Sequence, residues 1–402
     1  MKRSARILLA LLLLSGVLIG CQRPYAAADV TQIELVEVVE TEAIVFQTNE
    51  LPGEMIARLA EADVVFLGEV HNLQNHAELL ASLAVRLQTE GFQQVLLECF
   101  HAFDWQVNAY ALGENIGLNP YLSQYYGAVL DVIRSHNESL PPAERIQVHA
   151  IDINHDLNAL VPSLQAYAAW LPDAAELHVL TEELASLSQE EQTILLEQFL
   201  AWMEEHAATL QNAWGEGPYR QIETMIDVQL KSIAIKQHWS SDYDDAHRER
   251  EAVICELVDA LLEDVDGSTL INMGFNHAQL LPLRGTDQEW LADYLSHHSA
   301  AAGDVFSICA TIADGYRLDN EGNPAAFSLM ERSKENELMR VLWEVGDGKP
   351  VFLPLEDPFF QDRMIPVNYL GDVRTTHPAD VYDAFILLTD VHPLESLGIR
   401  LP

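Results

Sequence analysis

Two short motifs of glycine and histidine are the first sign of chemistry in this sequence of 402 residues. GEVH, which ends in His71, and GFNH, which ends in His277, each follow an apolar run. Glycine lets the backbone turn sharply and approach a ligand closely, and the histidine then points back toward the end of the run. Two imidazoles and a carboxylate from Glu69 or Glu98 are enough ligands for a catalytic divalent metal with an open position. The same groups could instead act without metal, as a general base and the acid that orients it.

Further acids and histidines follow other apolar runs of the chain. Open α/β sheets bind their ligands in the crevice beyond the carboxyl ends of the strands, so residues that follow separate strands meet there. We therefore predict one active or binding site that gathers Glu69, His71, His76, Glu98, Asp152, His155, His277 and Asp390.

Several of these residues also have a purely structural explanation. Glu69 and Asp152 could cap the helices that follow their strands, because acids stabilise helix N-termini. His76 could begin a helix, and His155 could be structural or solvent-exposed. Glu98 is harder to explain in this way, because a carboxylate at the end of an apolar run is costly to bury without a partner.

The elements that must position these residues can be read from the apolar pattern. Short apolar runs alternate with amphipathic stretches, which predicts an α/β fold with a mostly parallel central sheet and helices on both faces. The runs are 63–68, 94–99, 147–153, 269–274, 305–312 and 382–390. Residues 157–265 show only helical patterns, so we predict a large helical insertion between two strands, which could cap the site.

The N-terminal segment predicts export. Residues 1–20 combine a basic start with an apolar stretch that is too short for a stable membrane span. The sequence LIGC resembles the lipobox of bacterial lipoproteins, which implies lipid attachment to Cys21. The alternative is an ordinary signal peptide followed by an incidental cysteine. We expect a tether over residues 21–42, a single domain over 43–402, and anchoring to the bacterial outer membrane or cell surface through the lipid alone.

Composition excludes some partners. The chain carries 22 basic and 62 acidic residues, a net charge of −40, which argues against nucleic acid and anionic membrane surfaces as partners. An acidic surface of this kind suits a salty medium, where ions screen the self-repulsion. Cys99, Cys255 and Cys309 lie in apolar surroundings and are predicted to be core residues, because free cysteine is among the most buried residue types.

The two histidine motifs, the acid of VLLECF and an intervening arginine resemble a superfamily. It joins the ChaN-like haem-binding lipoproteins, the erythromycin esterases, and the TraB and TIKI proteins. LGEVHNLQNH is most similar to the ChaN version, and HREREAVICELVDALLEDVDGSTLINMGFNHA resembles the helix and strand that lead to the second histidine. On that match Arg248 takes the place of the family arginine, with Arg250 close by. The similarity covers about 60–160 and 240–280, while the helical insertion has no counterpart in it.

The resemblance implies a fold and a site more than one reaction, since such proteins hydrolyse a macrolide ester, cleave peptide bonds with a divalent metal, or bind haem. Our first hypothesis is a hydrolase of an ester or amide in a small molecule or peptide. In it His71 and His277 bind a metal or activate water, Glu98 orients or ligates, Glu69 supports, and Arg248 stabilises the oxyanion. The second is a lipoprotein that takes up haem or an iron compound, with histidine axial ligands. The third is a scaffold with a vestigial site.

Overall fold

The computed structural model describes residues 32–172, 174–282, 288–319, 323–328, 337–369 and 372–394. Its centre is an eight-stranded sheet with the order β1-β9-β12-β6-β2-β5-β3-β4. All neighbours from β12 to β4 pair in parallel, whereas β9 is antiparallel to both β12 and β1. The strands are β1 (Ile44–Val45), β2 (Val64–Glu69), β3 (Phe92–Phe100), β4 (Gln147–Asp152), β5 (Ser268–Gly274), β6 (Val305–Ile312), β9 (Val351–Pro354) and β12 (Ala384–Leu388). The predicted α/β class is confirmed, and the six predicted runs are the six parallel strands.

Helices cover both faces of this sheet, as the sequence predicted. Because side chains of a strand alternate between faces, Val65 and Leu67 of β2 belong to one hydrophobic core, and Val64 and Phe66 belong to the other. One face carries α3 (Gly53–Leu59), α4 (Gln74–Gln88), α5 (Asp104–Ala111), α6 (Pro120–Tyr125) and α7 (Gly127–Asn137). The other carries α2 (Gln32–Glu42), α13 (Tyr243–Glu263), α14 (Leu291–His297), α16 (Glu337–Gly346), α17 (Pro358–Asp362) and α18 (Pro378–Val381).

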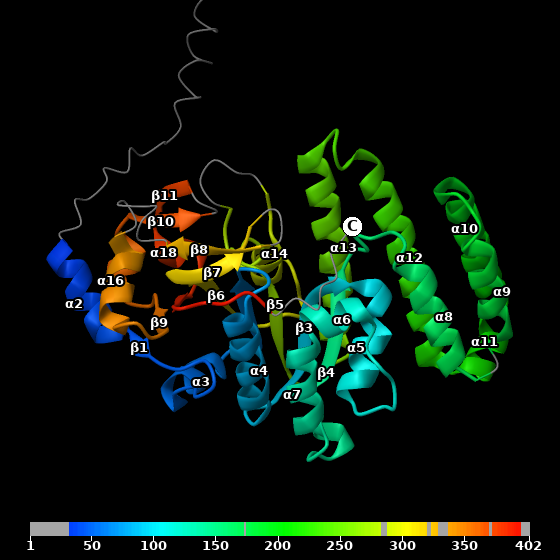
Figure 1. Ribbon diagram of the computed structural model, residues 1–402, viewed down its shortest axis with the longest axis horizontal. Helices are drawn as coiled ribbons and strands as arrows, with labels where there is room; N and C mark the ends of the chain where they lie inside the picture. The colour runs from blue at the N-terminus through cyan, green and yellow to red at the C-terminus, as the bar shows by residue number, and fades with distance from the viewer. Residues whose placement is uncertain are drawn as a thin grey trace, which may run out of the picture.

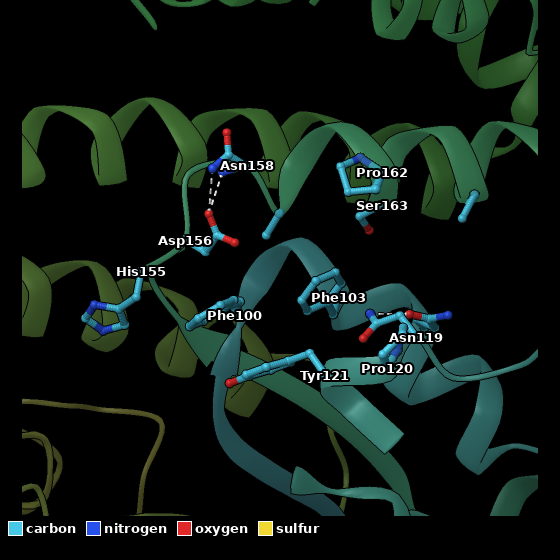
Figure 2. Close-up of a pocket in the computed structure, with 13 residues that line it drawn as sticks. Phe100, Phe103, Asn119, Pro120, Tyr121, His155, Asp156, Asn158, Pro162 and Ser163 are labelled. Atoms are coloured by element: carbon cyan, nitrogen blue, oxygen red, sulfur yellow. Dashed lines mark hydrogen bonds between the residues drawn. The ribbon is translucent and has the colours of Figure 1, made fainter. Parts of the chain in front are cut away.

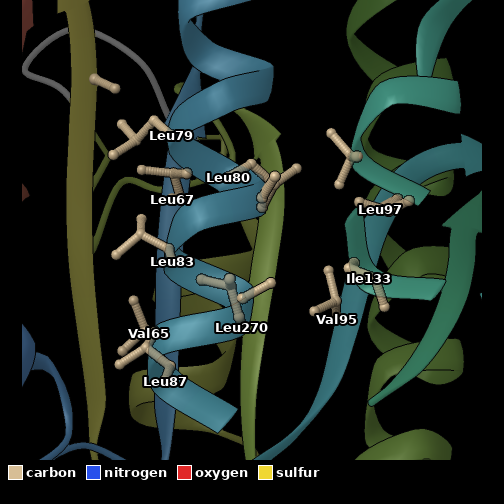
Figure 3. Close-up of a cluster of buried hydrophobic side chains, with 14 of the residues drawn as sticks. Val65, Leu67, Leu79, Leu80, Leu83, Leu87, Val95, Leu97, Ile133 and Leu270 are labelled. Atoms are coloured by element: carbon tan, nitrogen blue, oxygen red, sulfur yellow. The ribbon is translucent and has the colours of Figure 1, made fainter. Parts of the chain in front are cut away.

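Helix α4 shows how the sequence specifies this packing. Leu79, Leu83 and Leu87 recur every four residues, and all three are fully buried. Figure 3 shows them over Val65 and Leu67 of the sheet. Burying one such leucine stabilises the fold by roughly 1.5–3 kcal/mol relative to leaving it exposed. This packing fixes the turn between β2 and α4, which carries His71.

The helical insertion lies between β4 and β5. Its helices are α8 (Leu160–Trp170), α9 (Ala175–Leu184), α10 (Gln189–Glu205), α11 (Ala207–Trp214), α12 (Glu216–His238) and α13. Helices α8 to α12 share a separate hydrophobic core, to which Trp105 of α5 also belongs. They extend beyond the β4 edge of the sheet, at the opposite end of the molecule from α2 (Figure 1). The predicted range of 157–265 agrees with these helices.

The predicted tether differs from the structure over its second half. Residues 32–42 form α2, whose Leu35 and Val39 are completely buried against α16 and the sheet. The two residues are four apart and therefore share one helical face. This part of the chain thus belongs to the folded domain, whereas the predicted signal, Cys21 and the rest of the tether lie outside the described residues.

The remaining elements are two small strand pairs and two 3-10 helices. Two small antiparallel pairs, β7 (Asp314–Leu318) with β8 (Pro324–Ser328) and β10 (Ile365–Tyr369) with β11 (Asp372–Thr376), flank the sheet. The 3-10 helices are η1 (His101–Phe103) and η2 (Pro142–Glu144). Cys99, Cys255 and Cys309 are buried and unpaired. Over the described ranges, no helix combines the length and apolarity needed to cross a bilayer.

Candidate active site

The carboxyl ends of four adjacent strands form the candidate site. Strands β2, β5, β3 and β4 lie side by side in that order, and their ends carry Glu69, Gly274, Glu98 and Asp152. A cavity of about 350 Å³ opens there, lined by Glu69, His71, Glu98, Asp152, His155 and Arg250 together with Phe100, Tyr121, Tyr125, Tyr126 and Asn272. The predicted convergence of separate strand ends is therefore present for these four strands.

His71 is held by the acid of its own motif. Its Nδ1 lies 2.7 Å from Glu69 Oε1, and its side chain is 53% exposed at the cavity wall. The other oxygen of Glu69 contacts His76 Nε2 at 3.0 Å and accepts a hydrogen bond from Asn272 Nδ2 at 3.1 Å. His76 is buried and also contacts Asn272 Oδ1, so it acts as a support for Glu69.

These contacts set the charges of the pair. Burial opposes ionisation of Glu69, but the nearby His76 and the hydrogen bonds from His71 and His76 hold its pKa well below the usual range. Partial burial also opposes the charge on His71, yet the hydrogen bond to Glu69 and the charge of Glu98 raise its pKa to about 9. At neutral pH the pair is therefore a carboxylate and an imidazolium.

Glu98 is the centre of the site. Its Oε1 accepts a hydrogen bond from Arg250 Nη2 at 2.5 Å, and its Oε2 accepts one from the backbone N–H of Gly274 at 2.6 Å. The Nε2 atoms of His71 and His277 lie 3.7 and 3.6 Å from its two oxygens. Burial would raise the pKa of Glu98, but His277 and Arg250 hold it well below the ordinary value.

His277 lies behind Glu98 rather than on the cavity wall. It is 4% exposed and is not among the residues that line the cavity. Its Nδ1 lies 2.7 Å from Oε1 of the buried Glu251. Despite burial, the charges of Glu251 and Glu98 raise the pKa of His277 to about 9. The site therefore repeats one arrangement, an imidazolium between two carboxylates.

The arginine of the site is Arg250, and the role expected for Arg248 has to be corrected. Arg250 is buried and binds both Glu98 and Asp152, the latter through Nε at 2.7 Å and Nη2 at 2.8 Å. Arg248 instead pairs with Asp245 on the exposed side of α13. Residues two positions apart on a helix, such as Arg248 and Arg250, point about 200° away from each other. Only one of the two arginines can therefore face the sheet.

Asp152 links this arginine to a second polar chain. Burial would raise its pKa, but Arg250 lowers it to about 2. Its Oδ2 lies 3.1 Å from His155 Nε2, and Lys236 Nζ lies 3.1 Å from His155 Nδ1. Because a lysine ammonium can only donate, His155 accepts at Nδ1 and donates to Asp152 from Nε2. His155 thus lines the cavity in a fixed orientation.

The two motif glycines leave room for close approach. A Cβ on Gly274 would lie 2.9 Å from His71 Nε2 and 3.4 Å from Glu98 Oε2. A Cβ on Gly68 would lie 2.7 Å from the Cα of Phe275, which belongs to the second motif. Each motif therefore packs against the other, and glycine is required by space.

Asp390 does not join the site, which corrects another expectation. Its side chain is 84% exposed and is not among those that line the cavity. The sheet order explains this, since β6 separates β12 from β2. The end of β12 is thus about 10 Å from the end of β2, at two strand spacings.

Sequence reasoning missed three contributors. Glu251 fixes His277, Asn272 fixes Glu69 and His76, and Tyr126 donates a hydrogen bond to the backbone oxygen of Glu98 at 2.5 Å. Helix periodicity could have selected the α13 residues, because Ala246, Arg250, Val253, Ile254 and Val258 are buried at intervals of three and four. Asn272 has no such signal inside an apolar strand.

The residues do not fit a divalent metal well. Both oxygens of Glu98 are engaged, Arg250 brings a positive charge to it, and both histidines are held as cations. Among the described residues, no group of three or more His, Cys, Asp or Glu side chains is arranged to hold a metal ion. The metal expected as one option stays a prediction.

Comparison with known proteins places the fold. No family model matches the sequence, and no curated protein matches it. Among solved structures, a Bacillus cereus protein is similar with a TM-score of 0.69 and 14% identity, covering 91% of this chain and 99% of its own. A histidine mutant of the erythromycin esterase EreC in its open conformation has a TM-score of 0.63 and 16% identity, with coverages of 89% and 100%.

A third structure, described as a succinoglycan biosynthesis protein, has a TM-score of 0.65 and 16% identity, with coverages of 91% and 99%. At these identities the likeness concerns the fold alone. The chain shares its fold with these three structures, one of which is an erythromycin esterase, as the motif resemblance implied. A coverage of 89–91% of the chain also means that part of the insertion is matched, although the sequence resemblance offered no counterpart for it.

Proposed function

We propose that this protein hydrolyses an ester or amide bond with water as the nucleophile and His71 as the general base. The arrangement that supports this is the pair of His71 and Glu69 at the cavity wall. Glu69 accepts the Nδ1 proton of His71, which leaves Nε2 facing Glu98 at the centre of the site. A base oriented by a carboxylate in this way is the usual means of activating a nucleophile.

In the proposed reaction, His71 carries one proton from the attacking water to the leaving group. Neutral His71 takes a proton from water at Nε2 while the water oxygen forms a bond to the substrate carbonyl carbon. The carbonyl oxygen becomes an oxyanion, and Arg250 supplies the fixed positive charge at the cavity wall. The bond to the leaving oxygen or nitrogen then breaks, and the leaving group receives the proton from His71. In this proposal Arg250 takes the role expected for Arg248.

The buried groups hold this arrangement in place. Glu98 is fixed by Arg250 and the Gly274 N–H, and His277 with Glu251 keeps Glu98 ionised from behind. An ionised Glu98 near His71 stabilises the imidazolium that forms when the base takes its proton. His277 is therefore proposed as a positioning residue.

The test uses uncharged p-nitrophenyl esters and the matching anilides, with release of the chromophore as the readout. His71→Gln should lower kcat by roughly 10²–10⁴-fold, because that is the usual contribution of a general base. His298→Gln, on the exposed end of α14, is the matched control and should leave kcat unchanged. Circular dichroism checks that both variants fold. Equal activity of His71→Gln and the wild type would refute the proposal.

Metal dependence is a separate question with its own measurement. Since the proposed step uses only side chains, activity should survive dialysis against a chelator, and added divalent metal should not raise kcat. Loss of activity on chelation and recovery with one metal would instead return His71, Glu98 and His277 to the ligand role expected from sequence.

Haem binding is the competing function, and its support is the similarity of LGEVHNLQNH to the ChaN motif. Hemin titration distinguishes it, because histidine ligation gives a saturable Soret band that His71→Ala removes. A band that does not saturate, or that survives the substitution, would reflect adsorption to apolar surface.

Export and lipid attachment are part of the same proposal. The reactive end of the molecule would then act outside the cytoplasm, on small molecules or peptides. Cys21→Ser should prevent lipid attachment, so that the protein is released in soluble form or accumulates as an unprocessed precursor. Normal processing and membrane association of this variant would exclude the lipoprotein assignment.

A further inference from the structure

A second cavity lies beside the candidate site. It measures about 660 Å³ and lies between α8 on one side and η1 with α6 on the other. Figure 2 shows Pro162 and Ser163 of α8 facing Phe103, Pro120 and Tyr121 across it. This volume is within the range of pockets that bind drug-sized molecules.

The two cavities share a wall. Phe100, Tyr121 and His155 line both of them. Phe100 and Tyr121 are stacked with ring centroids 4.8 Å apart, and Phe103 lies 5.8 Å from Tyr121. A ligand in the second cavity would therefore adjoin the space in front of Glu98 and Arg250, with Phe100 and Tyr121 at the boundary.

Two polar residues of this wall, Gln106 and Ser163, are already hydrogen-bonded within the protein. Gln106 donates to the Gly117 carbonyl and accepts from Asn119. Ser163 accepts from Trp105 and donates to the Ala102 carbonyl. Since these groups have made their hydrogen bonds, the wall offers a ligand mainly the apolar surfaces of Phe, Tyr, Pro and Ala side chains. The one acid at the wall, Asp156, would disfavour an anionic group.

We propose that this cavity binds an uncharged apolar group of the substrate, alkyl or aryl, next to the bond that is hydrolysed. This inference rests on the proposed hydrolase function. It adds the class of substrate, which is an ester or amide with one bulky apolar side. Occupation of the cavity would hold the carbonyl group before His71, so that binding energy far from the reacting atoms serves orientation.

The kinetic test uses p-nitrophenyl esters with acyl chains of increasing length. In the wild type, kcat/KM should rise about fourfold with each methylene, the transfer free energy of one buried methylene, until the cavity is full. Ala166→Phe places a ring in the cavity and should abolish this dependence on length. Ala169→Phe adds the same ring to an exposed position of α8 that does not line the cavity, and should keep it.

A binding test that needs no hydrolysis separates this inference from the proposed function. The uncharged fluorophore N-phenyl-1-naphthylamine should bind the wild type and Ala169→Phe saturably, and Ala166→Phe at least tenfold more weakly. If binding follows this order while no ester is cleaved, the apolar site stands and the hydrolase proposal fails. If esters are cleaved by a His71-dependent reaction but neither chain length nor Ala166→Phe matters, the apolar site is refuted and the hydrolase stands.

Discussion

At the scale of single residues, the site is an alternation of acidic and basic side chains, of which His71 is half exposed and the others are largely buried. Glu69, His71, Glu98 and His277 follow one another, with Glu251 at the far end and Arg250 beside Glu98. Each of the two histidines lies between carboxylates, so its charged form is stabilised. The cost is that the base is protonated at neutral pH, and this has a measurable consequence for rate.

We predict that kcat/KM rises with pH and levels off above about 9. His71 acts as a base only when neutral, and its pKa is raised from 6.5 to about 9, so the neutral fraction grows tenfold per pH unit below that value. Glu69→Gln removes the negative charge that helps to raise this pKa and should move the inflection toward 6.5. Asp390→Asn, on an exposed acid outside the cavity, should leave it in place. A rate that falls above neutral pH would show that His71 acts as an acid.

A second prediction compares the two arginines of α13. Arg250→Met leaves Glu98 and Asp152 without their shared cation, and should lower the free energy of unfolding by about 3–5 kcal/mol, the usual loss when one partner of a buried pair is removed. Arg248→Met removes an exposed pair with Asp245 and should cost much less. Urea denaturation measures both. Equal losses would contradict the assignment of Arg250 to the site.

At the scale of elements, the sequence predicted the parallel strands and the residues at their ends. Apolar runs and the polar residues that follow them are local features, which can be read without knowing how the strands pair. It did not predict sheet order, which depends on long-range pairing, so Asp390 was placed in a crevice that its strand does not reach. The helix register around Arg248 and Arg250 was also misassigned, since a short motif match was followed instead of burial periodicity. Residues 32–42 were predicted to be a tether from their composition. Composition does not show the spacing of Leu35 and Val39, which places both on the buried face of a helix.

The packing of the two glycine motifs gives a prediction at this scale. Gly274→Ala places a methyl 2.9 Å from His71 Nε2, a side-chain atom that can move, so the fold should persist while His71 is displaced. A displacement of about 1 Å at a catalytic group can cost about 100-fold in rate. Gly68→Ala meets the backbone of Phe275 instead, and overpacking of this kind costs about 1–3 kcal/mol of stability. Activity and thermal melting measured on both variants check the contrast, and an active, stable Gly274→Ala would contradict it.

At the scale of the whole molecule, the main electrostatic feature is the net charge of −40, which affects stability. Repulsion among the acids favours the expanded unfolded chain, and mobile ions shorten the range of this repulsion from about 10 Å at 0.1 M to about 3 Å at 1 M salt. The site itself is buried and paired, so screening affects it less than it affects the surface.

We therefore predict that Tm rises as sodium chloride increases from about 0.1 M to about 1 M. Potassium chloride at equal ionic strength should give the same rise, because screening does not depend on the identity of the cation. Scanning calorimetry measures both series. A Tm that stays level or declines would show that the acidic surface does not limit stability.

The three buried cysteines turn the folded molecule into its own reporter of opening. Burial raises the pKa values of all three thiols, so thiolate, the form that alkylating reagents attack, is scarce while the chain is folded. Cys99 follows Glu98 on β3, and Cys255 lies one turn after Glu251 on α13. The labelling rate of Cys99 would therefore measure how often β3 opens, and that of Cys255 how often α13 opens. No substitution in the protein is needed for this measurement.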